Sequence, residues 1–462
     1  RQKELHMGRK PNDAFQSQLD EMVQVLREEI RNGVWAKGEF LPSEAALVNR
    51  FRLSKKSIRK GLDLLVSEGL IEKIPRVGNK VVNVPEKRES VIKLGYYPSL
   101  DMETELAKII DDFQAEYPHI QVCRVGIPYE NFSRTVKEYI KNDMLDVFTV
   151  NYTDYQGLID ENALDLLEPL ETDPELYPFL TKPFQQDGRT YVLPMTFSPV
   201  ILCYNRDHFR EKNLPEPDSS WTWEDVMKAA SKLSDEKGRY GIYYHLPSKN
   251  RWPVFLLQAG MKFERDGNRR YTVCTPAFLE GIRTGREIIF RQGIVPSFVS
   301  ESDTDTERLF LQQKVSMIIT TYFGLNYLRD AEFVYDVSPL PHLSEPSTLL
   351  LIVGLAVNRN SSQKQAVQTL LRYLLSERIQ SRIRMNTLSL PAHKRAAEWV
   401  GEDERLRPAR FHMYREVIPT FRLFTDMGLS RRQLDIITNE LRLYWSQMEN
   451  ETSICNRLEE LL

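Results

Sequence analysis

The feature that most constrains this chain is a change of hydrophobic pattern at a short charged segment, residues 85–90 (Pro-Glu-Lys-Arg-Glu-Ser). Before this segment, apolar residues recur at the spacing of helices, whereas after it short strand-like runs alternate with helical spacing. A charged stretch that begins with proline is typical of a linker. The chain of 462 residues is also too long for one compact core. We therefore expect two units, 1–84 and 91–462, joined by 85–90.

Net charge is divided unevenly between the two units. Residues 1–85 hold 16 Lys and Arg against 11 Asp and Glu, a net charge of +5, and the remaining 377 residues carry −8. Six basic residues and no acidic one lie between positions 50 and 60. Such a run can be a solvated helix face or a nucleic-acid contact, so the surrounding pattern must decide between the two.

The first unit is predicted to hold three helices and a β-hairpin. Apolar residues at helical spacing predict a first helix over 13–31. Ser43 and Ser54 stand where they can cap two further short helices. Two short helices with a tight turn between them form a helix-turn-helix unit. The β-prone runs on both sides of 75–78 then predict a hairpin, or wing.

The third helix is the expected recognition helix. Its apolar stripe must face the core, which leaves its basic and polar residues directed outward. A recognition helix presents its N-terminal residues to base edges and phosphates in the major groove of DNA. The residues expected on this outward face are Lys55, Lys56, Ser57, Arg59 and Lys60.

The first unit resembles a known family in three ordered runs, 41–47 (LPSEAAL), 53–62 (LSKKSIRKGL) and 68–71 (EGLI). With the wing, these runs resemble the winged-helix domain of GntR-family bacterial regulators. The resemblance implies a homodimer that binds a palindromic operator through the recognition helix and the wing tip. It extends the expected DNA-binding set to Ser43, Ser54, Arg76 and Gly78. The chain departs from the family pattern at Arg76, where the family usually has a glycine.

The second unit follows a strand–helix–strand pattern. Alternating apolar residues over 91–97, helical spacing to 117 and a second β-prone run over 120–125 indicate an α/β sheet. A further strand over 145–150 is followed by the polar and aromatic residues 151–154. Open α/β sheets bind ligands at the carboxyl ends of their strands, so a site is expected there.

The second unit resembles family 1 extracellular solute-binding proteins, the sugar receptors of ABC transporters. The ordered runs that carry this resemblance are 116–122, 188–194, 204–209, 221–226, 313–319, 337–341 and 389–394. The implied fold is the two-lobed α/β, type II periplasmic-binding-protein-like architecture. The expected lobes are about 91–195 plus 320–345, and about 200–318 plus 350–462.

The cleft between such lobes is expected to bind an oligosaccharide. Aromatic rings stack on sugar faces, and a few fixed polar groups satisfy the hydroxyls. The resemblance points to Asn151, Tyr152, Asp154, Lys249, Arg251, Trp252, Tyr322 and Phe323 as ligand-binding residues. Trp252 stands in a polar segment before a proline, which favours a place at the cleft rim.

Catalytic and metal-binding patterns are weak. There is no GxSxG and no HExxH, and the P-loop glycine spacing at 33–38 lacks the following Lys-Ser/Thr. The four cysteines form no CxxC and are widely separated. We therefore expect no catalytic residue, no metal and no cofactor.

Together these patterns favour a cytoplasmic, sugar-responsive transcription regulator, with release of operator DNA on sugar binding preferred to sugar-dependent activation. One alternative is a transport receptor, which needs a secretion signal or lipid-anchor cysteine that the N-terminal residues do not suggest. The other is a carbohydrate-processing enzyme with a DNA-binding appendage. The longest apolar stretch, 349–357, is too short to span a bilayer, so no membrane contact is expected.

Overall fold

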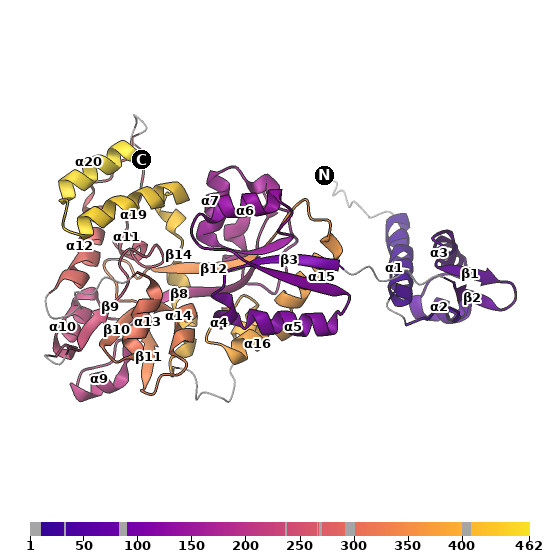
Figure 1. The fold of residues 1–462 in the computed structure, drawn as a ribbon, viewed down its shortest axis with the longest axis horizontal. Coiled ribbons are helices and arrows are strands. Elements are labelled where there is room, and N and C mark those ends of the chain that lie inside the picture. The colour runs from indigo at the N-terminus through magenta and orange to yellow at the C-terminus, as the bar shows by residue number, and fades with distance from the viewer. Residues whose placement is uncertain are drawn as a thin grey trace, which may run out of the picture. The chain divides into compact units, whose positions relative to one another are not determined.

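The protein was analysed as a computed structural model that describes residues 11–31, 34–82, 90–235, 238–265, 267, 270–291, 301–399 and 408–462. Two compact units are present, Arg1–Glu89 and Ser90–Leu462 (Figure 1). The expected linker lies outside the described residues apart from Ser90, which begins the first strand of the second unit.

The first unit is a winged helix, as the sequence predicts. It contains α1 (Pro11–Arg31), α2 (Glu44–Phe51) and α3 (Lys55–Ser67), followed by β1 (Ile71–Ile74) and β2 (Gly78–Val81). The two strands pair in antiparallel register and form the wing.

The core of the first unit forms where α3 packs against α1. Leu62 and Leu65 of α3 and Leu26 of α1 are fully buried in this core. A Cβ atom on Gly61 would lie 2.1 Å from Cε of Met22 and 3.1 Å from Cγ2 of Val23. A glycine at this position therefore allows the two helices to approach closely.

The second unit is built on one sheet with the strand order β4-β3-β5-β12-β8-β10-β9. The strands are β3 (Ser90–Tyr96), β4 (Ile120–Gly126), β5 (Val147–Asn151), β8 (Leu193–Asn205), β9 (Tyr240–Tyr243), β10 (Val315–Thr321) and β12 (Thr348–Val357). β3 is parallel to β4 and β5, whereas β12 is antiparallel to β5 and β8.

The long strand β8 joins the two ends of this sheet. Its first half pairs with β12, and its second half pairs with β10 and with β11 (Tyr335–Ser338). Every residue of β8 is buried, so no stretch of it alternates between core and solvent. β8 therefore belongs to both lobes, one around β3–β5 and one around β9–β11.

Helices cover both lobes. In the first lobe, α6 and α7 lie on one side of the sheet and α5 and α16 on the other (Figure 1). The helices of this lobe are α4 (Leu100–Thr104), α5 (Leu106–Glu116), α6 (Phe132–Lys141), α7 (Tyr152–Asp160), α15 (Lys364–Leu375) and α16 (Glu377–Asn386). Those of the second lobe are α9 (Arg206–Glu211), α10 (Trp223–Leu233), α11 (Pro253–Gln258), α12 (Pro276–Phe290), α13 (Asp303–Leu311), α19 (Arg431–Trp445) and α20 (Glu451–Leu461).

Shorter elements complete the unit. They are α8 (Pro178–Thr181), β6 (Gln185–Gln186), β7 (Arg189–Thr190), α14 (Tyr322–Leu325), β13 (Leu390–Pro391), α17 (Lys394–Ala397), α18 (Tyr414–Val417) and β14 (Phe421–Arg422), together with short 3-10 turns. No helix among the described residues is long and apolar enough to cross a membrane.

The lobes differ from the expected division in two segments. Helices α15 and α16, expected in the second lobe with 350–462, belong to the first, where α15 packs on α5 and β3. Arg378 of α16 also forms an ion pair with Glu116 of α5 at 2.6 Å. Strand β11, expected in the first lobe with 320–345, pairs with the second half of β8. Periodicity identifies the buried face of a helix but not the distant sheet that covers it.

Candidate functional site

The expected serine caps begin the two short helices of the first unit. Ser43 Oγ accepts a hydrogen bond from the amide of Ala46 at 3.2 Å, which starts α2. Ser54 Oγ accepts one from the amide of Ser57, also at 3.2 Å, and starts α3. Each cap satisfies an amide that has no partner inside the helix, so the helix start is fixed by local chemistry.

The basic residues of α3 form an exposed surface. Lys55, Lys56, Arg59 and Lys60 are all exposed, and the first turn of α3 contains no acidic residue. Arg59 Nε donates to the Glu44 carboxylate at 2.9 Å, while the side chain of Arg59 stays 56% exposed. The pair orients the guanidinium and leaves more than half of the side chain accessible to solvent.

Ser57 does not lie on this exposed surface, contrary to the sequence-based expectation. It is only 4% exposed, and its hydroxyl is hydrogen-bonded to that of Ser54 at 2.7 Å. The buried face of α3 also contains Ile58, Gly61 and Leu62. The stripe that faces the core is therefore wider than the apolar residues alone indicate, and it includes the small side chain of Ser57.

The wing turn places Arg76 in the left-handed region of backbone space, at φ +67°, with the side chain exposed. Gly78 follows at φ +149° and begins β2. The left-handed conformation disfavours a side chain by roughly 1–2 kcal/mol, which explains why a glycine suits this position. Arg76 keeps the turn and adds a positive charge at its tip.

The second unit contains a cleft of about 1290 Å³. Of the expected ligand-binding residues, Asn151, Tyr152, Asp154, Lys249, Arg251 and Phe323 all line it. Small-molecule sites commonly occupy roughly 300–1,000 Å³, so this cleft is larger than a typical small-molecule site.

Asp154 is the centre of a hydrogen-bonded network at the end of β5. Its carboxylate accepts from the Tyr97 hydroxyl at 2.6 Å and from Asn151 Nδ2 at 2.8 Å. Asn151 in turn caps α7 by accepting from the amide of Asp154 at 2.8 Å. Burial raises the pKa of Asp154 to about 6, although the Tyr97 hydrogen bond and the charge of Arg431 oppose this shift. The network fixes polar groups at the cleft wall.

The expected cations Lys249 and Arg251 are held by different partners. Lys249 forms an ion pair with Asp435 of α19, as does Arg431. Arg251 is 3% exposed, and its Nε donates to the carbonyl of Ile319 at 3.2 Å. The positions of both side chains are therefore set before any ligand binds.

Two buried carboxyl groups of the cleft wall, Glu103 and Glu307, were not expected from the sequence. Glu103 is 8% exposed and Glu307 is 2% exposed. Burial raises the pKa of each to about 7. Thr320 Oγ1 donates to Glu307 at 2.6 Å. A carboxyl group that is neutral near this pH can both donate and accept hydrogen bonds.

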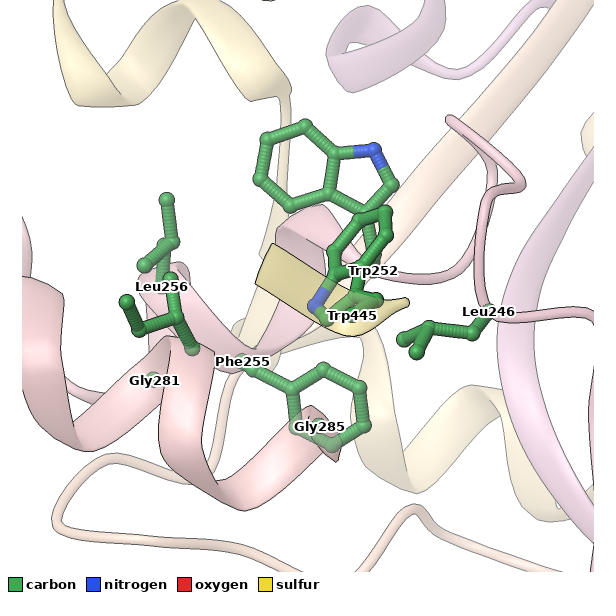
Figure 2. Close-up of a pocket in the computed structure, with 8 residues that line it drawn as sticks. Leu246, Trp252, Phe255, Leu256, Gly281, Gly285 and Trp445 are labelled. Atoms are coloured by element: carbon green, nitrogen blue, oxygen red, sulfur yellow. The ribbon is translucent and has the colours of Figure 1, made fainter. Parts of the chain in front are cut away.

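Trp252 and Tyr322, both expected in the cleft, lie in the core instead. Trp252 is 2% exposed and packs against Trp445, beside a cavity of about 10 Å³ that Phe255 and Leu256 also line (Figure 2). Tyr322 is fully buried, and its hydroxyl donates to the carbonyl of Phe411 at 2.7 Å. The polar segment does reach the cleft through Lys249 and Arg251, but the chain turns into α11 at Trp252.

The sequence also gave no reason to select α19. Arg431, Asp435, Asn439 and Arg442 of this helix line the cleft at intervals of three and four residues. Such a polar face is indistinguishable in sequence from a solvated helix surface. Other cleft residues that sequence reasoning missed are Ser99, Tyr129, Asp160, His245, Ser248, Asp303 and Tyr327.

The fold and these surfaces define a class of protein in which a winged-helix DNA-binding unit is joined to a two-lobed receptor for small solutes. Residues 99–381 match the bacterial extracellular solute-binding protein family, and residues 19–81 match the bacterial regulatory proteins of the gntR family. The chain belongs to the solute-binding family, and its first unit is a gntR-type domain. Neither is a family of enzymes.

Similar sequences are found separately for each unit. A binding protein of Brucella abortus is 25% identical over 222 residues, which cover 46% of this chain and 53% of that protein. The chain therefore spans about half the length of such relatives. The histidine utilization repressor of Klebsiella aerogenes is 34% identical over 74 residues, 16% of this chain and 31% of the repressor.

Solved structures resemble the second unit in fold. An ABC substrate-binding protein of Listeria monocytogenes, in complex with cycloalternan, gives a TM-score of 0.67 at 19% identity and covers 80% of this chain and 97% of its own. The GacH receptor of Streptomyces glaucescens, studied with acarbose, gives 0.68 at 15% identity over 80% and 97%. Maltose-bound MalE3 of T. maritima gives 0.66 at 17% identity over 81% and 100%.

Proposed function

We propose that this protein is a transcription regulator whose affinity for operator DNA responds to an oligosaccharide bound in the cleft of the second unit. The observation that carries the proposal is the presence, in one chain, of a gntR-type winged helix and a solute-binding fold. The neighbours bound to cycloalternan and maltose support a saccharide as the ligand class.

The residues of the cleft suit a saccharide. Asn151, Asp154 and Lys249 provide fixed hydrogen-bonding groups, and Tyr152 and Phe323 provide rings. Polar atoms satisfy the hydroxyl groups of a sugar, and aromatic rings cover its C–H faces. The volume of about 1290 Å³ accommodates an oligosaccharide in preference to a monosaccharide, which would leave most of it filled with water.

The first unit supports DNA binding. Lys55, Lys56 and Lys60 are exposed on α3 and can neutralise phosphates, and Arg59 can reach a base edge. We propose a homodimer on a palindromic operator, because two winged helices then read two half-sites. Since operator DNA lies in the cytoplasm of bacteria, the proposed function requires a cytoplasmic protein.

Ligand binding and DNA binding are coupled in this proposal. Closure of two lobes around a ligand is an established switching motion. We propose that closure lowers operator affinity, so that the sugar releases repression of genes for its own uptake or use. A coupling of this kind is typically about 1–3 kcal/mol and acts equally in both directions.

The test uses the full chain in three steps. Operator DNA is first selected from a randomised palindromic library, and a panel of linear tri- and tetrasaccharides is screened by the melting temperature. Operator affinity is then measured with and without the best saccharide. Weaker operator binding with sugar supports the repressor, and tighter binding would make the protein an activator. Saccharide binding with no DNA binding at any salt concentration would identify a transport-type receptor and overturn the proposal.

A further inference from the structure

Tyr129 is a partly exposed aromatic residue in the cleft wall that sequence reasoning did not select. It lies between β4 and α6, lines the cleft and is 53% exposed. Its ring stacks on that of Tyr97, with ring centres 4.5 Å apart and planes inclined by only 7°. Tyr97 covers one face of the ring, and no other aromatic ring packs against Tyr129 among the described residues.

The ring of Tyr129 is also held in place. Its hydroxyl is hydrogen-bonded to Ser99 Oγ at 2.6 Å. The Tyr97 ring beneath it is 1% exposed and is itself fixed, since its hydroxyl donates to Asp154 at 2.6 Å. Phe132 packs on the same Tyr97 ring at a centre distance of 5.5 Å. An exposed large side chain ordinarily loses rotamer freedom on binding a ligand, and these contacts reduce that loss.

We propose that Tyr129 is a stacking platform for one pyranose ring of the saccharide, with Tyr97 as its rigid support. The C–H face of a pyranose is apolar and flat, so it packs against an aromatic face. The hydroxyl groups at the ring edge then meet polar groups near the platform. Ser99, Asn151 and Glu103 line the same cleft and supply donors and acceptors.

A purely structural role for Tyr129, or a role in which its ring packs against a cationic side chain, explains the geometry of the ring less well. A tyrosine that only supports the fold would bury its ring, as Tyr97 does, instead of exposing half of its surface to a cleft. No Lys or Arg is among the residues that stack on or hydrogen-bond to Tyr129 in the described structure. The exposed face is thus left to an apolar surface of the ligand.

This inference rests on the proposed saccharide ligand, and the test separates the two. Calorimetry compares the full-length wild type with Tyr129→Ala, Tyr129→Leu and Tyr129→Phe, using the linear saccharide that most raises the wild-type melting temperature. Loss of an aromatic platform should weaken binding about tenfold or more in the Ala and Leu variants. The Phe variant keeps the ring and should stay within about threefold of the wild type. The melting temperatures of the unliganded variants report whether the fold is intact.

A second measurement uses Tyr129→Trp, which keeps a flat ring and adds an indole reporter. Contact with a sugar should change its fluorescence relative to the wild type on addition of the same saccharide. Wild-type affinity in the Ala and Leu variants, or a Trp variant that binds sugar without an additional fluorescence change, would overturn the platform and leave the regulator proposal standing. Failure of the wild type to bind any saccharide in the panel would overturn both.

Discussion

At the scale of single residues, burial changes the protonation of two carboxyl groups in the cleft wall. Glu103 and Glu307 are almost inaccessible to solvent, and burial raises the pKa of each to about 7. Nothing in the local sequence of either residue indicates this, because burial of a carboxylate depends on distant segments of the chain. The burial of Trp252 was not predicted for the same reason. Its polar sequence neighbours line the cleft, whereas its own ring lies in the core.

The raised pKa of Glu307 predicts a dependence of stability on pH. Its pKa in the fold, about 7, is higher than that of an exposed glutamate, so the fold favours the protonated form. This contribution to stability is fully present below the ordinary pKa of glutamate and is lost as the pH rises through 7. Glu307→Gln should therefore flatten the fall in stability between about pH 4.5 and pH 7 by roughly 1–3 kcal/mol. Calorimetric melting across this range measures the effect, and identical pH profiles for both proteins would contradict it.

The exposed surface of α3 predicts which residues bind the operator. Lys55→Ala and Arg59→Ala should each weaken operator binding by about 1–3 kcal/mol if the side chain reaches a base, and by less if it contacts only phosphate. Ser57→Ala is the matched control on the same helix, because its hydroxyl is directed to Ser54 and not outward. Fluorescence anisotropy at several salt concentrations provides the affinities. Equal affinity for wild type, Lys55→Ala and Arg59→Ala would remove the recognition helix from the interface.

At the scale of secondary-structure elements, the sequence predicts the features that depend only on neighbouring residues. The caps at Ser43 and Ser54 and the first strands of the α/β unit follow from neighbouring residues, and the structure has them at the expected places. The assignment of α15 and α16 to a lobe failed because the partner of a helix is set by contacts far away in the chain. The cleft-facing side of α19 was missed for the same reason.

The packing of α3 on α1 gives a prediction for Gly61. An alanine there would place Cβ within 2.1 Å of Met22 Cε, and within 3.2 Å of Leu19 Cδ1. The methionine end can move, but overpacking of a core typically costs about 1–3 kcal/mol, which exceeds the helix propensity of roughly 1 kcal/mol gained over glycine. Gly61→Ala should therefore lower the melting temperature of the first unit, measured by calorimetry of the full chain. A stabilised protein would show that the two helices pack less closely than described.

At the scale of the whole molecule, the proposed function depends on communication between two units that have separate cores. The segment 85–90 has six residues and, even when extended, spans no more than about 20 Å. In the proposed coupling, this short tether transmits lobe closure to the winged helix. The sequence predicted the fold class of both units, but it holds no local signal for how one unit influences the other.

Lengthening this tether tests how the signal passes. Insertion of about fifteen flexible Gly/Ser residues after Pro85 should preserve DNA binding and saccharide binding while removing their coupling, because a flexible linker no longer transmits lobe closure. Operator affinity with and without saccharide, compared with the wild type, measures the change. Coupling that survives the insertion would require a direct contact between units or protomers.

The most direct test of the account is the operator affinity of the wild-type protein measured with and without a saturating saccharide, paired with its saccharide affinity measured with and without operator. We predict that the saccharide weakens operator binding by about 5- to 150-fold, and that the operator weakens saccharide binding by the same factor. Operator affinity that does not change at saturating saccharide would contradict the central claim that this chain is a saccharide-responsive regulator.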